Sequence, residues 1–178
     1  MLHVLDTDVV SNLRKQTPNA RLLDWLGRTP QEEVGIPLVA VFEIQIGIEG
    51  LRLAGKCGKA DEIEHWLEGL LQARGDFLIA PDVDVVRLQA RMFSTPALRN
   101  FLWPDPRSTK LKLGADLIVA ATAISRGAAI VSFNVSDYEQ IHSYFPIPGL
   151  YQPGSGEWVI KPERHESAPP GGSTKQAP

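Results

Sequence analysis

The stretch LHVLDTDVVSNLRK, residues 2–15, joins an apolar run to a helical pattern through two aspartates. Residues 2–6 are typical of a short buried strand that ends at Asp6. The following TDVVSNLRK predicts a helix, which Thr7 or Asp8 could cap with a side-chain oxygen. A buried strand that runs directly into a helix is the repeating element of α/β proteins, so the same alternation is expected in the rest of the chain.

That alternation continues along the chain. The apolar spacing of residues 39–53 fits a helix, although their β-branched side chains leave a strand as the alternative. Residues 114–127, GADLIVAATAISRG, predict a helix that is apolar nearly all round and therefore buried. The pattern predicts an α/β fold, with a parallel sheet covered by helices on both faces. Further strands are expected at 34–38, 77–81 and 128–133, further helices at 19–28, 59–74 and 82–93, and a short helical turn with an edge strand within 136–148.

Composition excludes several classes of protein. The chain has 178 residues, of which 43% are apolar and 22% charged, which suits one soluble domain with a substantial core. Cys57 is the single cysteine, so an internal disulfide and a cysteine-built metal site are excluded. No apolar run reaches membrane-spanning length, and the N-terminus lacks the basic region of a signal peptide, so a cytoplasmic location is expected. The net charge of −3 argues against a nucleic-acid coat protein.

Acidic and amide side chains fall at the ends of the expected elements. Asp6 ends the first strand, and Asp116 opens the buried helix. Asn134 and Asp137 follow the fourth strand. Each aspartate has an ordinary structural explanation as a helix cap or a turn residue. Glu43 has none that fits easily, because it lies in the middle of the apolar run IPLVAVFEIQIGI.

Together these carboxylates predict a metal site. Parallel sheets place their functional groups at the carboxyl ends of the strands, where Asp6, Glu43 and Asp116 could converge. Clustered carboxylates repel each other and raise each other's pKa, and a divalent cation relieves that repulsion. A site made only of oxygen ligands suits Mg²⁺ or Mn²⁺ and not zinc. Such an ion with its bound water can cleave a phosphodiester bond.

Four motifs, in order, resemble those of the PIN domain: LDTDVVS, the Glu43 helix with Gly47 after it, GADLIVAATA and SFNVSDYE. The resemblance covers residues 1–148 and is nearest to VapC-type and FitB-type toxins. It implies a Rossmann-like three-layer α/β/α fold around a parallel sheet. It also implies a Mg²⁺- or Mn²⁺-dependent endoribonuclease, a homodimer, and neutralisation by a VapB-type antitoxin in a type II toxin–antitoxin system.

The resemblance also assigns roles to individual residues. Asp6, Glu43 and Asp116 correspond to metal ligands, and the hydroxyls of Thr7 and Ser11 correspond to groups that orient Asp6 or a water. At the fourth motif this chain has Asn134, a neutral oxygen donor, with Asp137 three residues later. These two belong to the expected catalytic set, and the neutral amide implies a weak or substrate-assisted second metal site. The apolar stripe of residues 59–74, with the helix at 39–53, is expected to form the dimer face.

The segments at 96–113 and 149–178 fit the resemblance less well. Residues 96–113 contain three prolines and are predicted to form a loop or lid, on which Phe101 or Trp103 could stack a base. Its basic residues could hold RNA phosphates, although an ordinary solvated loop is slightly favoured. Residues 149–178 form a Gly/Pro-rich extension, of which 161–178 are expected to be disordered. Those basic residues are Arg99, Arg107, Lys110 and Lys112.

Two other functions remain open at this point. DTDVV fits the D-x-D-x-V start of a haloacid-dehalogenase-type phosphatase, with Asp6 as nucleophile and Asp8 as general acid. That interpretation leaves Glu43 unexplained. The other alternative is a non-catalytic PIN-like module that only binds partners. The motifs do not identify the RNA that would be cleaved.

Overall fold

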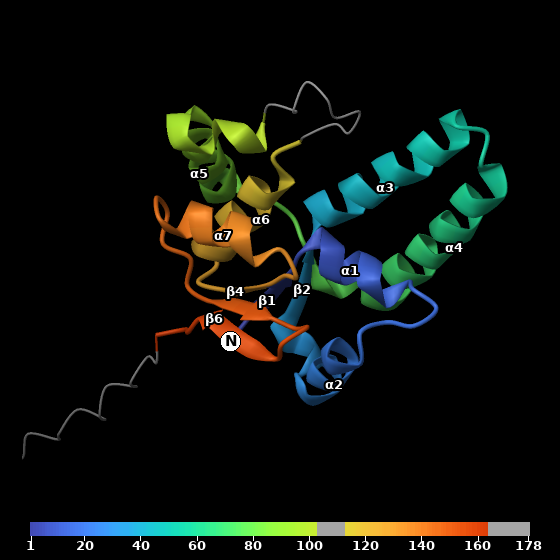
Figure 1. Ribbon diagram of the computed structural model, residues 1–178, viewed down its shortest axis with the longest axis horizontal. Helices are drawn as coiled ribbons and strands as arrows, with labels where there is room; N and C mark the ends of the chain where they lie inside the picture. The colour runs from blue at the N-terminus through green and yellow to red at the C-terminus, as the bar shows by residue number, and fades with distance from the viewer. Residues whose placement is uncertain (103–112, 164–178) are drawn as a thin grey trace, which may run out of the picture.

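The computed structural model describes residues 1–102 and 113–163, which form a mixed six-stranded sheet in the order β3-β2-β1-β4-β5-β6 (Figure 1). The first five strands in this order are parallel, and β6 runs antiparallel to β5. In register, His3 pairs with Val34 on one side and with Ala129 on the other, so β1 lies in the middle of the sheet. The strands are β1 (His3–Leu5), β2 (Val34–Pro37), β3 (Leu78–Ile79), β4 (Ala129–Val131), β5 (Leu150–Gln152) and β6 (Glu157–Ile160).

Helices cover both faces of the sheet, which confirms the predicted three-layer α/β/α fold. Val4 packs into the core with α5, α6 and α7, whereas the next residue, Leu5, packs into the core with α1, α2 and α4 on the opposite face. The α-helices are α1 (Thr7–Leu13), α2 (Ala20–Arg28), α3 (Leu38–Leu53), α4 (Cys57–Arg74), α5 (Val83–Ser94), α6 (Ala115–Ser125) and α7 (Val135–His142), and short 3₁₀ helices occupy Gln31–Glu33, Gly75–Phe77 and Pro96–Phe101.

Residues 39–53, for which the sequence left helix and strand open, belong to helix α3. Pro37 ends β2, and the helix starts at the next residue. Its buried side chains Ala40, Ile44 and Ile48 recur every four residues, which places them on one stripe against the core. Helix α6 is buried nearly all round, as predicted, so its first turn is held firmly against the sheet.

The sheet continues past residue 148, the boundary expected from the sequence. Strand β5 begins at Leu150, after the segment expected to hold an edge strand, and β6 extends the sheet to Ile160. Aromatic rings hold this hairpin against the body, with the ring centroids of Trp25 and Tyr151 5.3 Å apart and those of Tyr151 and Trp158 5.3 Å apart. The prediction of disorder for 161–178 falls almost wholly on residues 164–178, which lie outside the described part of the chain.

The proline-rich segment differs from its prediction at its start. Pro96–Phe101 forms a 3₁₀ helix, which begins with proline at its first position. Phe101 is only 4% exposed because its ring packs in the core beside α6, so the prediction that it stacks a base is wrong. Trp103, Arg107, Lys110 and Lys112 lie outside the described residues.

The apolar stripe of α4 packs against the core of its own chain. Ile63 and Leu67 are buried in the core cluster that includes α3, and Trp66, Leu70 and Leu71 pack against that cluster. The stripe is therefore not the free apolar face that the sequence suggested for a dimer. Within the two described ranges, no helix is long and apolar enough to cross a membrane.

Candidate active site

Asp6 lies at the carboxyl end of the central strand β1 and is only 4% exposed. It is the N-cap of α1, because one carboxylate oxygen accepts a hydrogen bond from the Thr7 amide at 2.7 Å. Its other oxygen accepts a hydrogen bond from the Ser132 hydroxyl at 2.7 Å. The cap assignment to Thr7 or Asp8 was therefore wrong. Burial raises the pKa of Asp6, and the Ser132 and Thr7 hydrogen bonds oppose that rise.

Glu43 faces Asp6 from α3. Its Oε2 accepts a hydrogen bond from the Thr7 hydroxyl at 2.6 Å, so Thr7 links the two carboxylates by donating to Asp6 through its amide and to Glu43 through its side chain. Burial raises the pKa of Glu43, the Thr7 hydrogen bond lowers it, and the charge of Asp6 raises it further. The carboxylate in the apolar run is thus neither a surface group nor part of an ion pair within the described residues.

Asp116 enters the cluster from the first turn of α6. Burial raises its pKa to about 7, and the charges of Asp6, Asp137, Glu43 and Asp8 each add to that rise. The position depends on Gly114, whose φ of 63° favours glycine. A Cβ on Gly114 would also lie 2.7 Å from Leu102 Cδ2, so a side chain there would require the Leu102 side chain to move.

Asn134 and Asp137 complete the cluster from the β4–α7 turn. The Asn134 side-chain amide donates to Asp137 Oδ2 at 2.7 Å, and the Asn134 backbone amide donates to the Ser132 hydroxyl at 2.9 Å. The carboxylate of Asp137 is close enough to raise the pKa values of Asp6 and Asp116. The side-chain amide of Asn134 therefore orients Asp137, and its nitrogen is occupied by this hydrogen bond.

Ser132 and Asp8 were missed as site residues. Ser132 is fully buried and donates a hydrogen bond to Asp6, which the sequence could not reveal because the two residues are 126 positions apart. Asp8 Oδ2 accepts a hydrogen bond from the Phe133 amide at 3.1 Å, which ties α1 to the turn that carries Ser132. Burial, followed by the charge of Asp6, raises the pKa of Asp8 to about 7.

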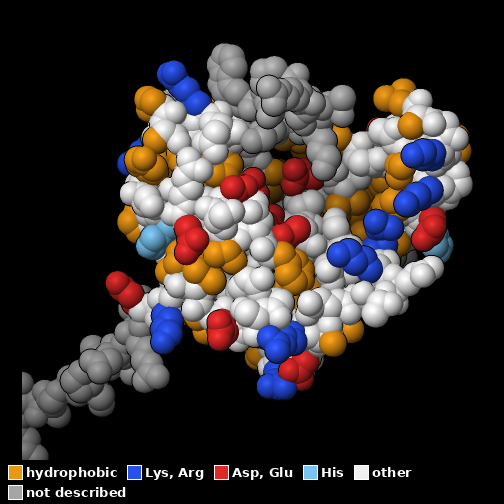
Figure 2. Space-filling view, viewed as in Figure 1, with side chains coloured by type: hydrophobic (Ala, Val, Ile, Leu, Met, Phe, Trp, Pro, Cys, Tyr) orange, Lys and Arg blue, Asp and Glu red, His pale blue; other side chains and the backbone are white. Residues whose placement is uncertain are grey.

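Ser11 lies beside Glu43 and not beside Asp6. It lies one turn after Thr7 and lines, with Glu43 and Arg14, a cavity of about 200 Å³ between α1, α3 and α4. It makes no hydrogen bond with Asp6 in the described structure, where the Ser132 hydroxyl donates to Asp6 instead, and the alternative role of orienting a water stays a prediction. Figure 2 shows Asp and Glu side chains gathered in the middle of one face, between α7 and the α3–α4 hairpin.

The cluster fits a hydrated Mg²⁺ or Mn²⁺ better than a fully protein-ligated ion. No three Asp, Glu, His or Cys side chains of the described residues come close enough to ligate one ion directly. Mg²⁺ usually keeps several waters and takes only one or two carboxylates from the protein. Burial raises the pKa values of Asp6, Glu43 and Asp116, and the charges of neighbouring carboxylates raise them further.

Removing the Ser132 hydroxyl should weaken metal binding without unfolding the protein. In Ser132→Ala, Asp6 loses the strongest of the hydrogen bonds that oppose the rise in its pKa. We expect Mn²⁺ affinity to fall by at least about tenfold, the usual cost of losing a group that orients a metal ligand. Calorimetric titration with Mn²⁺ measures it, with Ser125→Ala at the exposed end of α6 as the matched control. Unchanged affinity would mean that Ser132 does not position Asp6.

Comparisons with known proteins show the family and the fold of the chain. The PIN domain family matches residues 3–140, and the chain belongs to that family. It is similar to VapC ribonuclease Y4jK of Sinorhizobium fredii, at 28% identity over 76% of this chain and 89% of that protein. It is also similar to plasmid stability protein StbB of Pseudomonas syringae pv. tomato, at 25% identity over 76% and 90%. Among solved structures, FitAB bound to the IR36 DNA fragment shares the fold, with a TM-score of 0.61 and 22% identity over 86% of this chain and 96% of that chain.

Proposed function

We propose that the protein is a Mg²⁺- or Mn²⁺-dependent endoribonuclease that acts as the toxin of a toxin–antitoxin pair. The observation that carries this proposal is the convergence of Asp6, Glu43 and Asp116 from three separate elements at one edge of the sheet, with their charges raising each other's pKa. The similarity to a VapC ribonuclease and to a plasmid stability protein supports the reaction and the toxin class.

In the proposed mechanism Asp6, Glu43 and Asp116 hold the ion, directly or through its waters. When bound, the ion would supply an activated water and neutralise charge on the reacting phosphate. Thr7 orients Glu43, and Ser132 orients Asp6, so both carboxylates keep their positions as the charge in the site changes. Asn134 holds Asp137 at the rim of the same cluster.

The proposed partners and location are those expected of the toxin of a toxin–antitoxin pair. We propose a VapB-type antitoxin that neutralises the toxin, a homodimer, and action in the cytoplasm on cellular RNA. The similarity in fold to FitAB is consistent with a two-component assembly.

Cleavage of RNA by the purified protein tests the proposal. We expect Mn²⁺ or Mg²⁺ to be required, EDTA to abolish cleavage, and products to carry a 5′-phosphate and a 3′-hydroxyl. Asp6→Asn and Asp116→Asn, purified in the same way, should be inactive, which excludes a contaminating nuclease. Expression of the parent without an antitoxin should arrest growth, whereas Asp6→Asn should not. Cleavage that persists equally in both variants would overturn the proposal.

The phosphatase alternative is disfavoured by the position of Asp8. A general acid must reach the leaving group, but Asp8 Oδ2 is bonded to the Phe133 amide and its Oδ1 is buried. The non-catalytic alternative is disfavoured because a binding module has no need for mutually repelling buried carboxylates.

Of the two helices expected to form the dimer face, the proposed interface keeps the start of α3 and leaves out the stripe of α4. Leu38 and Phe42 are 39% and 55% exposed, and they line an apolar cavity of about 280 Å³ between α3, α5 and α6. Val86 on α5 is half exposed, one turn before Gln89, which also lines this cavity. Exposed apolar side chains around an apolar hollow are typical of a surface that another chain covers.

Phe42→Glu should therefore convert a dimer into a monomer. In a symmetric dimer the new glutamate would be present once in each subunit. Both carboxylates would be buried in the interface without a counter-charge or water, which is costly. Light scattering on a sizing column at micromolar concentration measures the mass. Leu23→Glu makes the same kind of change at an exposed leucine on α2 and should leave the mass unchanged. A dimeric Phe42→Glu protein would place the interface elsewhere.

A further inference from the structure

Four arginines in the described ranges have neither an ion-pair partner nor a hydrogen-bond partner: Arg14 lines the cavity beside Glu43, and the other three lie on one surface away from the acidic cluster. Arg28, Arg52 and Arg126 form ion pairs, and the guanidinium groups of Arg21 and Arg74 donate to backbone carbonyls. Within the described ranges, the guanidinium groups of Arg87, Arg91 and Arg99 have neither kind of partner. All three are exposed and lie on α5 or on the 3₁₀ helix that follows it.

This arrangement does not contribute to the stability of α5. Arg87 and Arg91 are four residues apart, so they are neighbours on one face of the helix, where like charges repel. Asp84, on the same helix, is exposed and forms no ion pair with either of them in the described structure. Two adjacent cations without a counter-charge suggest that an anion outside the chain provides it.

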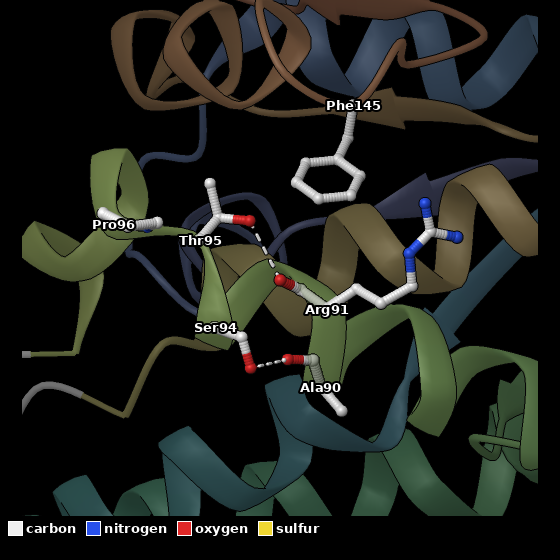
Figure 3. Close-up of a pocket in the computed structure, with 6 residues that line it drawn as sticks. All are labelled: Ala90, Arg91, Ser94, Thr95, Pro96 and Phe145. Carbon is white, nitrogen blue, oxygen red and sulfur yellow. Dashed lines mark hydrogen bonds between the residues drawn. The ribbon is translucent and has the colours of Figure 1, made fainter.

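An aromatic ring lies beside these arginines. Arg91 and Phe145 line a shallow hollow of about 560 Å³ together with Ala90, Ser94, Thr95 and Pro96 (Figure 3). The Phe145 ring points into the hollow, and the Arg91 guanidinium carbon lies 6.0 Å from its centroid. The hydroxyls of Ser94 and Thr95 donate to the carbonyls of Ala90 and Arg91, so the wall of the hollow is fixed by the helix itself.

Helix α7 connects this hollow to the acidic cluster. Asn134 and Asp137 lie at the start of this helix. Phe145 follows its last turn and comes eight residues after Asp137, which corresponds to about 12 Å of helix. The side chain of Gln140 donates to the Ala97 carbonyl at 2.9 Å, which fixes α7 against the 3₁₀ helix that carries Arg99. A polymer with an end at the hollow could therefore reach the carboxylates without a change in the fold.

We infer that the α5 surface, defined as Arg87, Arg91, Arg99 and Phe145, is a binding subsite for a single-stranded segment of the RNA substrate. The arginines bind backbone phosphates, and Phe145 stacks an unpaired base beside the Arg91 guanidinium. The inference rests on the proposed ribonuclease function and adds to it a site for substrate binding outside the acidic cluster. The cations also offset the repulsion between RNA phosphates and the carboxylates of the active site.

The test separates binding from cleavage. In an Asp6→Asn background, the affinity for a labelled single-stranded RNA of mixed sequence is measured by anisotropy at several salt concentrations. Replacing the three arginines with Ala should lower the steepness of the salt dependence by about two, because each phosphate contact to a single strand contributes about 0.7. Phe145→Leu should weaken binding by about tenfold with little change in salt dependence, and less for the same RNA as a duplex.

Controls distinguish this inference from a structural role and from the proposed function. Arg28→Ala removes an exposed arginine on α2 and should leave RNA affinity unchanged. Loss of the repulsion between Arg87 and Arg91 should leave the melting temperature equal or higher. In the active protein the triple variant should show a raised KM with the parent's kcat. Salt dependence and KM equal to those of the parent would overturn the inference even if the parent cleaves RNA, whereas a parent that binds RNA through this surface but cleaves none would overturn only the proposed function.

Discussion

Glu43→Gln should yield a protein that folds at least as well as the parent without metal, yet cleaves RNA at least about a hundredfold more slowly. Glutamine keeps the size of the side chain, and its carbonyl oxygen can still accept the hydrogen bond that the Thr7 hydroxyl donates to Glu43. It removes a buried charge whose pKa is raised by burial and by Asp6. Repulsion in the cluster therefore falls, and so does the attraction for a cation.

Thermal unfolding with and without Mn²⁺ measures both effects. The parent should gain about 2.7 kcal/mol of stability at a hundredfold excess of the ion over its Kd, and the variant clearly less. Glu68→Gln, at an exposed site on α4, is the matched control and should behave as the parent. If Glu43→Gln unfolds without metal, Glu43 is a structural partner in the core. If the variant is stable and fully active, the assignment of Glu43 to the metal site is wrong.

The metal-free protein should become less stable as pH rises towards neutrality. The carboxyl of Asp116 has a pKa of about 7 in the folded protein and an ordinary value of 3.8 when unfolded. Between these two values the folded state holds a proton that the unfolded state has lost, so each step up in pH favours unfolding. The loss is complete above about pH 7 and amounts to on the order of 4 kcal/mol for such a group.

Comparison of the parent with Asp116→Asn in EDTA, from about pH 5 to about pH 8, isolates this effect. The melting temperature of the parent should fall across this range, and the curve of the variant should be flatter because one of the carboxyl groups with a strongly raised pKa is gone. Saturating Mn²⁺ should flatten the curve of the parent as well, because the ion replaces the protons. Parallel curves for parent and variant would mean that Asp116 titrates normally and is not in a carboxylate cluster.

The layers and the three principal carboxylates could be predicted because they depend on local patterns. Asp6 follows a buried strand, Asp116 opens an apolar helix, and Glu43 interrupts an apolar run, and each of these features is visible within about fifteen residues. The roles of Ser132 and Asp8 were not visible, because each depends on a hydrogen bond between segments more than 120 positions apart. The burial of Phe101 was missed for the same reason, since its contacts are with other elements of the core.

The β5–β6 hairpin was missed for a different reason. Its Gly, Pro and Ser content resembles a flexible tail, but these residues form the turn, where Gly156 has a φ of 79°. Tyr151 and Trp158, two aromatic residues on either side of this turn, were the available signal, because aromatic side chains favour strands. They pair across the hairpin and against Trp25, so composition alone was misleading.

The central position of β1 has a consequence for biosynthesis. His3, Val4 and Leu5 pair with residues 129–131, so the first strand to leave the ribosome waits for one of the last before the middle of the sheet can form. Until then Ser132 and Asp137 have not been synthesised, so Asp6 lacks the hydroxyl that donates a hydrogen bond to it and its acidic neighbour. A nascent chain therefore has no assembled acidic cluster during most of its own translation. The proposed active site therefore cannot form before residues 129–137 have emerged from the ribosome.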